Sequence, residues 1–413
     1  MIISLNGSFN CSFEGTDIPS SNLSVPGTIQ ASKIAPHTQG RDTGNLTDEH
    51  EYSGVVMLSR QMTIPQGYDS YILSIERSRI TKLYIDGQPV GRRDSLIAPH
   101  VYDITSYLTR EDTLIQIEID NKNYPCPGGH LTSKDTQTNW SGILGDVYIK
   151  CTNKAHIVSA SVKADYYRKS AYLTIGVAKN CPSDKVNIKV RTSLCKLLDK
   201  YLNKDADPSE FKKFRDDISI AAKGTDYDIL KKYLEITEDI LKPQEFTESS
   251  STDSKSFGHA DTKYINAKYA NTSYIKTDSD NNNDSISDNY SGNTHDGISD
   301  NSSDDNMCSF TYELDLTASD KGVFEWDTFT PYLYVFDIEL CDESGSVLDS
   351  TKAVCGLRNL RADGNDLLLN NRPIFLRGRH CGLLFPMTGF APMNACGWLY
   401  DMMISRRWGT NAY

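Results

Sequence analysis

Two guanidiniums and an imidazole follow an apolar hairpin near the end of the sequence. The stretch LLLNNRPIFLRGRHCG reads as two apolar strands around Asn370-Asn371, followed at once by Arg377, Arg379 and His380. An arginine presents a planar fork of donors that suits carboxylates and sugar hydroxyls. Arg379 and His380 are therefore candidates for binding a substrate. The alternative is structural: Arg377 pairs with a carboxylate and stabilises a core, and His380 only packs.

A second polar group lies in GGHLTSKDTQTNW, Gly128 to Trp140. Sugars are bound by planar hydrogen-bonding groups and an aromatic face, and this glycine-flanked stretch supplies both. Asp135 and Asn139 are the main candidates for sugar contact, and His130 is a weaker one. The alternative is an ordinary turn in which Asp and Asn cap backbone groups, with Trp140 packed in the core.

Composition narrows the class of function. The chain has 413 residues and a formal charge of −12, which argues against nucleic acid or an anionic membrane as a partner and leaves neutral substrates open. No run of about 18 apolar residues is present, and the first residues lack the features of a secretion signal, so the expected compartment is the cytoplasm. The ten cysteines are scattered without zinc spacing; we expect neither a structural metal nor a cofactor.

The first 152 residues show short alternating strands broken by turns, such as TKLYIDGQPVG. Asp86-Gly87 is a strong hairpin signal. Helical periodicity is absent, which predicts an antiparallel β-sandwich of jelly-roll type over 1–152.

A second β-region over 153–357 is interrupted by an insertion at 194–307. Its first part, 194–242, is charged and helical in composition. Its second part, 243–306, is rich in Ser, Asp and Asn and cannot bury enough apolar area to offset its ordering entropy, so it is expected to be disordered. The simplest account is one immunoglobulin-like sandwich with an insertion in a loop. The insertion is either a solvated expansion or a segment that binds a partner.

From residue 358 the pattern becomes a hairpin, a loop and a helix. Asn394 is the expected N-cap and Gly409 the expected C-terminal stop of the helix ACGWLYDMMISRRWG. The final TNAY could open a parallel strand. Strand, loop, helix and strand form one βα unit and the start of another.

Five stretches in this order resemble the N-terminal portion of glycoside hydrolase family 2, the β-galactosidase, β-glucuronidase and β-mannosidase group. They are VPGTIQ (Val25–Gln30), EYSGVVMLSRQMTIP (Glu51–Pro65), TNWSGILGDVYI (Thr138–Ile149), WDTFTPYLYVFDIEL (Trp326–Leu340) and GLRNLR with LNNRPIFLRGRH (Gly356–Arg361 and Leu369–His380). The family's usual Trp-Tyr before Arg60 is here Met57-Leu58.

The resemblance implies a jelly-roll sugar-binding domain, an immunoglobulin-like domain and, over 358–413, the truncated start of a TIM barrel. Residues at the C-terminal ends of barrel strands face the active site, which is where Arg377, Arg379 and His380 would lie. In the family, the jelly-roll loop before the Gly-Ile motif reaches towards the barrel and contacts the sugar, which is the role implied for Asp135 and Asn139.

The resemblance also implies a retaining hydrolase of terminal β-linked sugars, β-galactosidase-like, and leaves a homo-oligomer open for the full-length form. Retaining glycosidases need two carboxylates about 5–5.5 Å apart, both glutamates on later barrel strands in this family. No Glu follows Glu343, so we expect no catalytic residue here and a chain that is inactive alone. The alternatives are a non-catalytic carbohydrate-binding β-sandwich protein and a scaffold built around the acidic insertion.

Overall fold

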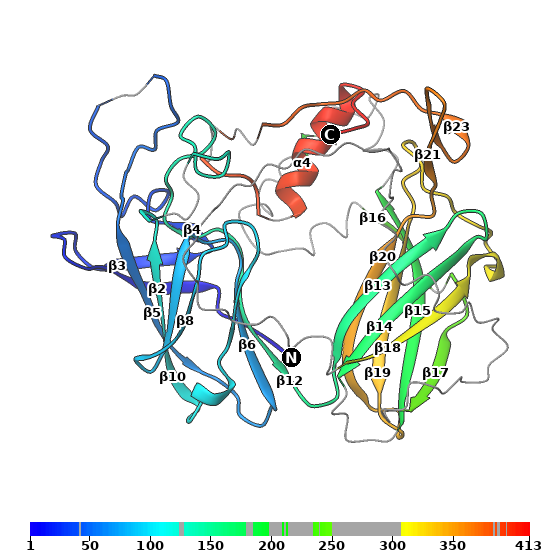
Figure 1. The fold of residues 1–413 in the computed structure, drawn as a ribbon, viewed down its shortest axis with the longest axis horizontal. Coiled ribbons are helices and arrows are strands. Elements are labelled where there is room, and N and C mark those ends of the chain that lie inside the picture. Colours follow the sequence, from blue (N-terminus) through cyan, green and yellow to red (C-terminus); the bar gives the residue numbers. More distant parts are fainter. Residues whose placement is uncertain are drawn as a thin grey trace, which may run out of the picture.

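The computed structural model is mostly β-structure, as predicted. It describes residues 1–40, 43–123, 128–178, 185–197, 209, 212–213, 234–238, 240–249, 307–382, 385, 389–393 and 395–413. Two β-sandwiches lie side by side, and one helix lies near the top of the view between them (Figure 1). Among the described residues, no sheet closes into a barrel.

The first sandwich packs a sheet ordered β1-β12-β6-β9 against one ordered β3-β2-β5-β10-β7-β8, with a short β11-β4 pair beside them. The elements are β1 (Ile2–Ser4), β2 (Gly7–Phe13), β3 (Ser21–Val25), β4 (Gly27–Thr28), β5 (Val55–Thr63), β6 (Ser70–Ile75), β7 (Ile80–Ile85), β8 (Gln88–Arg93), β9 (His100–Asp103), the 3₁₀ turn η1 (Thr105–Tyr107), β10 (Asp112–Asp120), β11 (Gly142–Ile143) and β12 (Val147–Thr152).

Alternation of apolar and polar residues explains this sandwich. In β10, Ile115, Ile117 and Ile119 are fully buried, while the residues between them are partly exposed. Period-two side chains of a strand face opposite sides of its sheet, so the apolar set fills the space between the sheets. The predicted hairpin at Asp86-Gly87 is present: both residues have positive φ, 49° and 81°, as a tight turn between paired strands requires.

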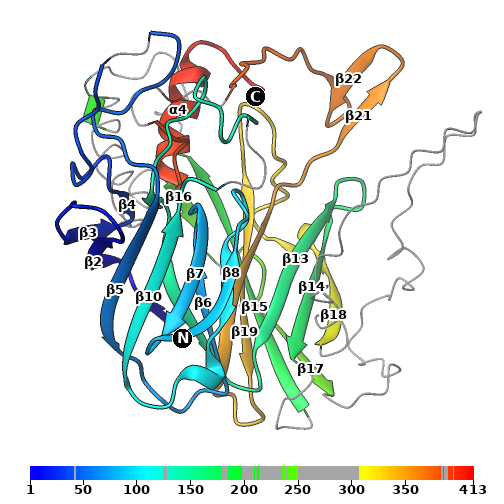
Figure 2. The ribbon, with the colours of Figure 1, turned by 60° about the vertical axis from the view of Figure 1, so that its left-hand side comes forward.

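The second sandwich packs a sheet ordered β13-β14-β18 against one that contains β16-β15-β19-β20, with β17 also paired to β15. Its strands lie beside the first sandwich in Figure 2. The elements are β13 (Ile157–Asp165), β14 (Ser170–Ala178), β15 (Lys185–Leu197), β16 (Leu234–Thr237), β17 (Gln244–Ser249), β18 (Met307–Asp315), the 3₁₀ turn η3 (Leu316–Ala318), β19 (Leu333–Cys341) and β20 (Val347–Cys355).

Where the structure describes residues of the expected insertion 194–307, it differs from the prediction. Positions 194–197, predicted to be helical, continue β15, and Leu234–Thr237 forms β16 beside them. Gln244–Ser249, predicted to be disordered, forms β17 against the other end of β15. These short segments become strands because the 13-residue strand β15 offers them a free edge. Most of 198–306 lies outside the described residues, including nearly all of the expected disordered part.

The C-terminal region contains β21 (Leu360–Asp363), β22 (Asp366–Leu369), β23 (Arg372–Pro373) and α4 (Ala395–Arg407). Asn370 and Asn371 have positive φ, as in the predicted tight hairpin turn. Gly378 and Ala412, on either side of α4, form an isolated parallel bridge outside the assigned strands, so the expected βα unit stays a prediction. Gly409, with φ of 85°, follows the helix end; the expected N-cap, Asn394, lies outside the described residues.

The strand expected before Arg377 is shorter than predicted and is exposed. Pairing in β23 ends at Pro373, and Phe375 and Leu376 are 77% and 51% exposed. In the described part of the chain this stretch has Asn411 and Ala412 as its parallel neighbours. A neighbour on one edge alone does not cover the faces of this stretch, which explains why Phe375 and Leu376 are exposed.

Candidate functional site

The loop from Gly128 to Trp140 is a series of tight turns on the first sandwich. His130 and Asp135 are exposed on it. The Thr136 hydroxyl donates to the His130 carbonyl at 2.6 Å, and the Ser133 hydroxyl donates to the Asp135 carboxylate at 3.2 Å. Both candidates therefore take part in local turn contacts.

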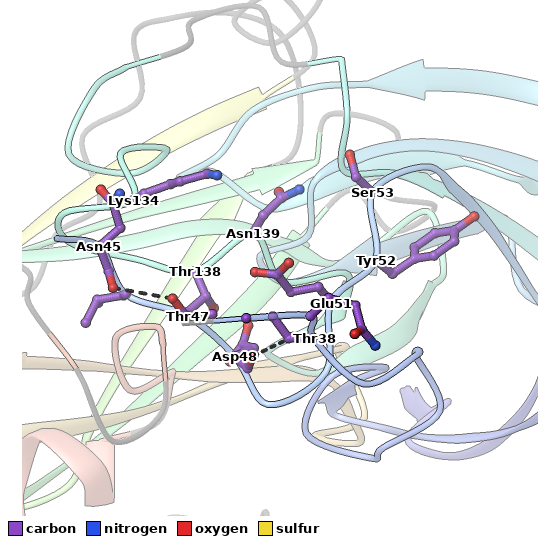
Figure 3. Close-up of a pocket in the computed structure, with 13 residues that line it drawn as sticks. Thr38, Asn45, Thr47, Asp48, Glu51, Tyr52, Ser53, Lys134, Thr138 and Asn139 are labelled. Carbon is purple, nitrogen blue, oxygen red and sulfur yellow. Dashed lines mark hydrogen bonds between the residues drawn. The ribbon is translucent and has the colours of Figure 1, made fainter. Parts of the chain in front are cut away.

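Asn139 lies at the end of this loop on the wall of a pocket of about 600 Å³. Segments 38–40 and 45–53 form the opposite wall, so the pocket is enclosed by two loops of the first sandwich (Figure 3). The Leu46 amide donates to the Lys134 carbonyl at 2.8 Å and ties the two loops together. The lining residues share a polar character: Thr38, Gln39, Asn45, Thr47, Asp48, Glu51, Tyr52, Ser53, Lys134, Thr138 and Asn139, with Gly40 and Leu46.

Asp48 and Glu51 give the pocket carboxylates that the sequence analysis did not single out. Burial raises the pKa of the Asp48 carboxyl; the Thr138 hydroxyl lowers it and the charge of Glu51 raises it again. The available signal was the polar run NLTDEHEYSG between two strands. That run has no motif spacing of its own. Its carboxylates become part of a pocket only when loop 128–140 folds against it.

A segment from the C-terminal region docks on the other side of this loop. The Thr138 amide donates to the Gly389 carbonyl at 3.0 Å, and the rings of Trp140 and Phe390 meet edge to face with centroids 6.2 Å apart. Trp140 is 2% exposed, so its ring packs within the protein. The loop is therefore held from both sides, by the first sandwich and by residues 389–390.

Arg77 adds a contact to this junction. Its guanidinium lies 3.4 Å from the Gln137 side-chain oxygen and 3.5 Å from the Met393 sulfur. Burial lowers the pKa of Arg77, and its backbone adopts a positive φ of 48°. A charged side chain placed this way links loop 128–140 to the residues that precede α4.

Arg379 has a different setting, against α4. The Arg379 guanidinium donates to Asp401 at 2.8 Å and to the Ser405 hydroxyl at 2.6 Å, and its backbone amide donates to Ala412. The side chain of Arg377 donates to the Gly409 carbonyl at 2.6 Å. His380 is exposed. Arg379, rather than Arg377, is the arginine paired with a carboxylate.

The predicted site residues thus form two groups, which are held by different parts of the structure. Asn139, and through their loop Asp135 and His130, are supported by the first sandwich, whereas Arg379 is supported by α4 and the last residues. Pocket and loop offer hydroxyl, amide and carboxylate groups for binding a polar neutral molecule. Among the described residues, no three His, Cys, Asp or Glu side chains are grouped to hold a metal ion.

Known proteins share this architecture. No family model matches the chain. The crystal structure of a glycosyl hydrolase family 2 member from Bacteroides cellulosilyticus superposes with a TM-score of 0.52 over 91% of this chain, at 12% sequence identity. Over the matched length, the chain has the fold of that glycosyl hydrolase family 2 structure. It spans 39% of the length of that family 2 structure.

Two β-galactosidases are similar in sequence over parts of the chain. The one from Thermoanaerobacter pseudethanolicus is 26% identical over 148 residues, 34% of this chain and 19% of the relative. The one from Alteromonas mediterranea is 38% identical over 53 residues, 13% of this chain and 5% of the relative. The predicted resemblance to family 2 is therefore confirmed for the fold, and the chain matches only a small part of these two relatives. No helix among the described residues is long and apolar enough to cross a bilayer.

Proposed function

We propose that the chain is the N-terminal part of a retaining glycosidase of family 2 that acts on terminal β-linked sugars, with a β-galactosidase-like preference. In this proposal, residues 358–413 begin a TIM barrel whose remainder, with the two catalytic carboxylates, is sequence that this chain does not contain. The chain contributes sugar contacts through Asn139 and Asp135, with Arg379, His380 and His130 as further candidates. The proposed setting is carbohydrate metabolism in the cytoplasm, with assembly into a homo-oligomer left to the full-length form.

The observation that carries the proposal is the placement of Asn139. The loop expected to contact sugar lines a polar pocket, and the same loop is docked by Thr138 on Gly389, nine residues after His380. A loop that joins the sugar-binding sandwich to the region following Arg379 is what a site shared between them requires. The sequence similarity to two β-galactosidases favours a galactoside over other β-linked sugars.

The carboxylates of the last segment support the assignment of catalysis to other sequence. Asp363 pairs with Arg361 at 3.0 Å, and Asp401 is held between Arg379 and the Tyr413 hydroxyl, each at 2.8 Å. An acid/base pair must be about 5–5.5 Å apart and face a sugar. Two of the three Asp side chains after residue 358, Asp363 and Asp401, are thus engaged in ion pairs, which suits them poorly to that role.

The test combines turnover with binding by the purified 413-residue chain. We expect no hydrolysis of a chromogenic β-galactoside, and weak binding of methyl β-galactoside, detected by saturation-transfer nuclear magnetic resonance and abolished by Asn139→Ala. The control is Asn22→Ala, which removes an exposed amide from β3. Hydrolysis by the chain would contradict the placement of the catalytic acids, and galactoside binding that survives Asn139→Ala would contradict the proposed sugar contact.

A further inference from the structure

The backbone around Asn139 is held by side chains rather than by a strand ladder. Three consecutive carbonyls, those of Thr138, Asn139 and Trp140, each accept a hydrogen bond from a side chain of the first sandwich. Backbone carbonyls of a buried segment normally bond to other backbone groups in helices and sheets. Here three consecutive backbone carbonyls bond to side chains instead, and the central one belongs to Asn139.

Arg79 holds the two outer carbonyls. Its guanidinium donates to the Thr138 carbonyl at 3.1 Å and the Trp140 carbonyl at 3.2 Å, and reaches the Leu131 carbonyl at 3.3 Å. It also lies 3.9 Å from the centroid of the Trp140 ring, a cation–π contact. Because these acceptors come from the beginning and the end of the loop, one buried cation closes it.

Gln30 and Asn121 hold the central carbonyl. Their side-chain amides donate to the Asn139 carbonyl at 3.0 Å and 3.1 Å. Asn121 also donates to the Tyr52 carbonyl at 2.8 Å and accepts from the Gly54 amide. Tyr52 and Asn139 lie on opposite walls of the pocket, so Asn121 fixes the spacing between those walls.

The three donors are buried at 5% exposure for Gln30, 1% for Arg79 and 0% for Asn121, and none of them is among the described residues that line the pocket. Burying a guanidinium and two amides is unfavourable unless every group is satisfied. In a loop that only joined two strands, the backbone carbonyls could instead accept hydrogen bonds from water. The burial of these three polar side chains is explained if they hold the side chain of Asn139 in one orientation.

We propose that Gln30, Arg79 and Asn121 are positioning residues that orient the Asn139 side-chain amide into the pocket for a hydrogen bond to a sugar hydroxyl. The identity of the ligand rests on the proposed function; the orientation of Asn139 does not. The three residues touch no substrate in this proposal and act through the backbone on either side of Asn139.

The experiment measures the order of the Asn139 side chain directly. In ¹⁵N-labelled chain, its side-chain NH₂ pair is assigned by its absence in Asn139→Asp. We compare the wild-type chain with Gln30→Met, which keeps the volume and removes the donor, and with Arg79→Lys, which keeps the charge and removes the fork. The control is Tyr71→Phe, which removes a buried hydroxyl bonded to Pro65 and Tyr68 in the same sandwich.

We expect a dispersed, slowly exchanging NH₂ pair in the wild-type chain and in Tyr71→Phe, and an averaged, faster-exchanging pair in Gln30→Met and Arg79→Lys. Affinity for methyl β-galactoside should fall about tenfold in the two positioning variants, and not in the control. The loss should not add to that of Asn139→Ala in the double variant, since both act through one side chain.

An Asn139 side chain that stays ordered in folded Gln30→Met would overturn the positioning role, whatever happens to sugar affinity. Should Arg79→Lys fail to fold, Gln30→Met still decides the question. A wild-type chain that binds no galactoside, but whose Asn139 loses order in Gln30→Met, would contradict the proposed function while supporting the positioning role.

Discussion

The two groups of predicted site residues are built in opposite ways. Around Asn139, irregular backbone is fixed by buried side chains and closed on its far side by residues 389–390. Around Arg379, the side chain is fixed by an ion pair at the surface, and its neighbour His380 is exposed. The side chains that hold the Asn139 backbone are buried, whereas the Arg379 side chain is 41% exposed and contacts one helix through Asp401 and Ser405.

This difference matters for the proposed binding of a ligand. A pre-ordered polar group loses little conformational entropy when a ligand arrives, whereas an exposed one must be ordered at that moment. The backbone carbonyl of Asn139 already accepts two hydrogen bonds from buried side chains, those of Gln30 and Asn121. Arg379 already satisfies its donors with Asp401 and Ser405, so a ligand would have to compete with them. In the proposed enzyme the first group therefore contributes recognition that does not depend on the rest of the barrel.

The largest effect on the free energy of unfolding is expected when Arg79, which holds the backbone around Asn139, is replaced. Arg79→Ala leaves the buried carbonyls of Thr138 and Trp140, and the partly buried one of Leu131, without the Arg79 donor and opens a cavity against Trp140. It should lower the free energy of unfolding by about 3 kcal/mol. The measurement is urea unfolding followed by circular dichroism. A loss no greater than that of an exposed arginine would show that the buried arrangement around Asn139 contributes little, and the comparison would fail.

A second, smaller effect tests the closure of the loop by the C-terminal segment. Gly389 has φ of 78°, and a Cβ placed on it would lie 2.4 Å from the Thr138 hydroxyl. Gly389→Ala should therefore cost about 2 kcal/mol, from backbone strain and the clash together.

The matched control for that substitution is Gly364→Ala, since Gly364 also has a positive φ, 61°, but a Cβ there meets nothing within 4 Å. It should cost about 1 kcal/mol from the backbone alone. Hydrogen exchange of the Thr138 amide, which donates to Gly389, should accelerate in Gly389→Ala and not in the control. Equal exchange rates in the two variants would mean that the segment does not restrain the loop.

The sequence was informative where structure is local. Alternation predicted strands such as β10, and Asp86-Gly87 and Asn370-Asn371 predicted tight turns, because these signals involve neighbouring residues. The donors around Asn139 were not predicted. Gln30 lies 109 residues from its acceptor, and the local sequence around an amide or guanidinium in a turn or bend does not indicate that the side chain will point inward.

The same limit explains the errors in the insertion. Segments Leu234–Thr237 and Gln244–Ser249 are only four and six residues long, too short for their own pattern to be decisive, and both pair with β15. The exposed stretch at Phe375 and Leu376 is the converse case: an apolar pattern predicted burial that the described neighbours do not provide. Sequence patterns state which side chains would be buried, and tertiary partners decide whether they are.

The smallest effect is expected at Arg379. Its side chain is 41% exposed and pairs with Asp401, so Arg379→Ala should lower the free energy of unfolding by only about 0.5 kcal/mol once solvent screening is included. The same urea unfolding measurement applies, repeated at high salt, where the difference should shrink because an exposed ion pair is screened. A loss near that of Arg79→Ala, unchanged by salt, would mean that the cluster around Arg379 is a structural core like that around Asn139, and the contrast between the two groups would no longer hold.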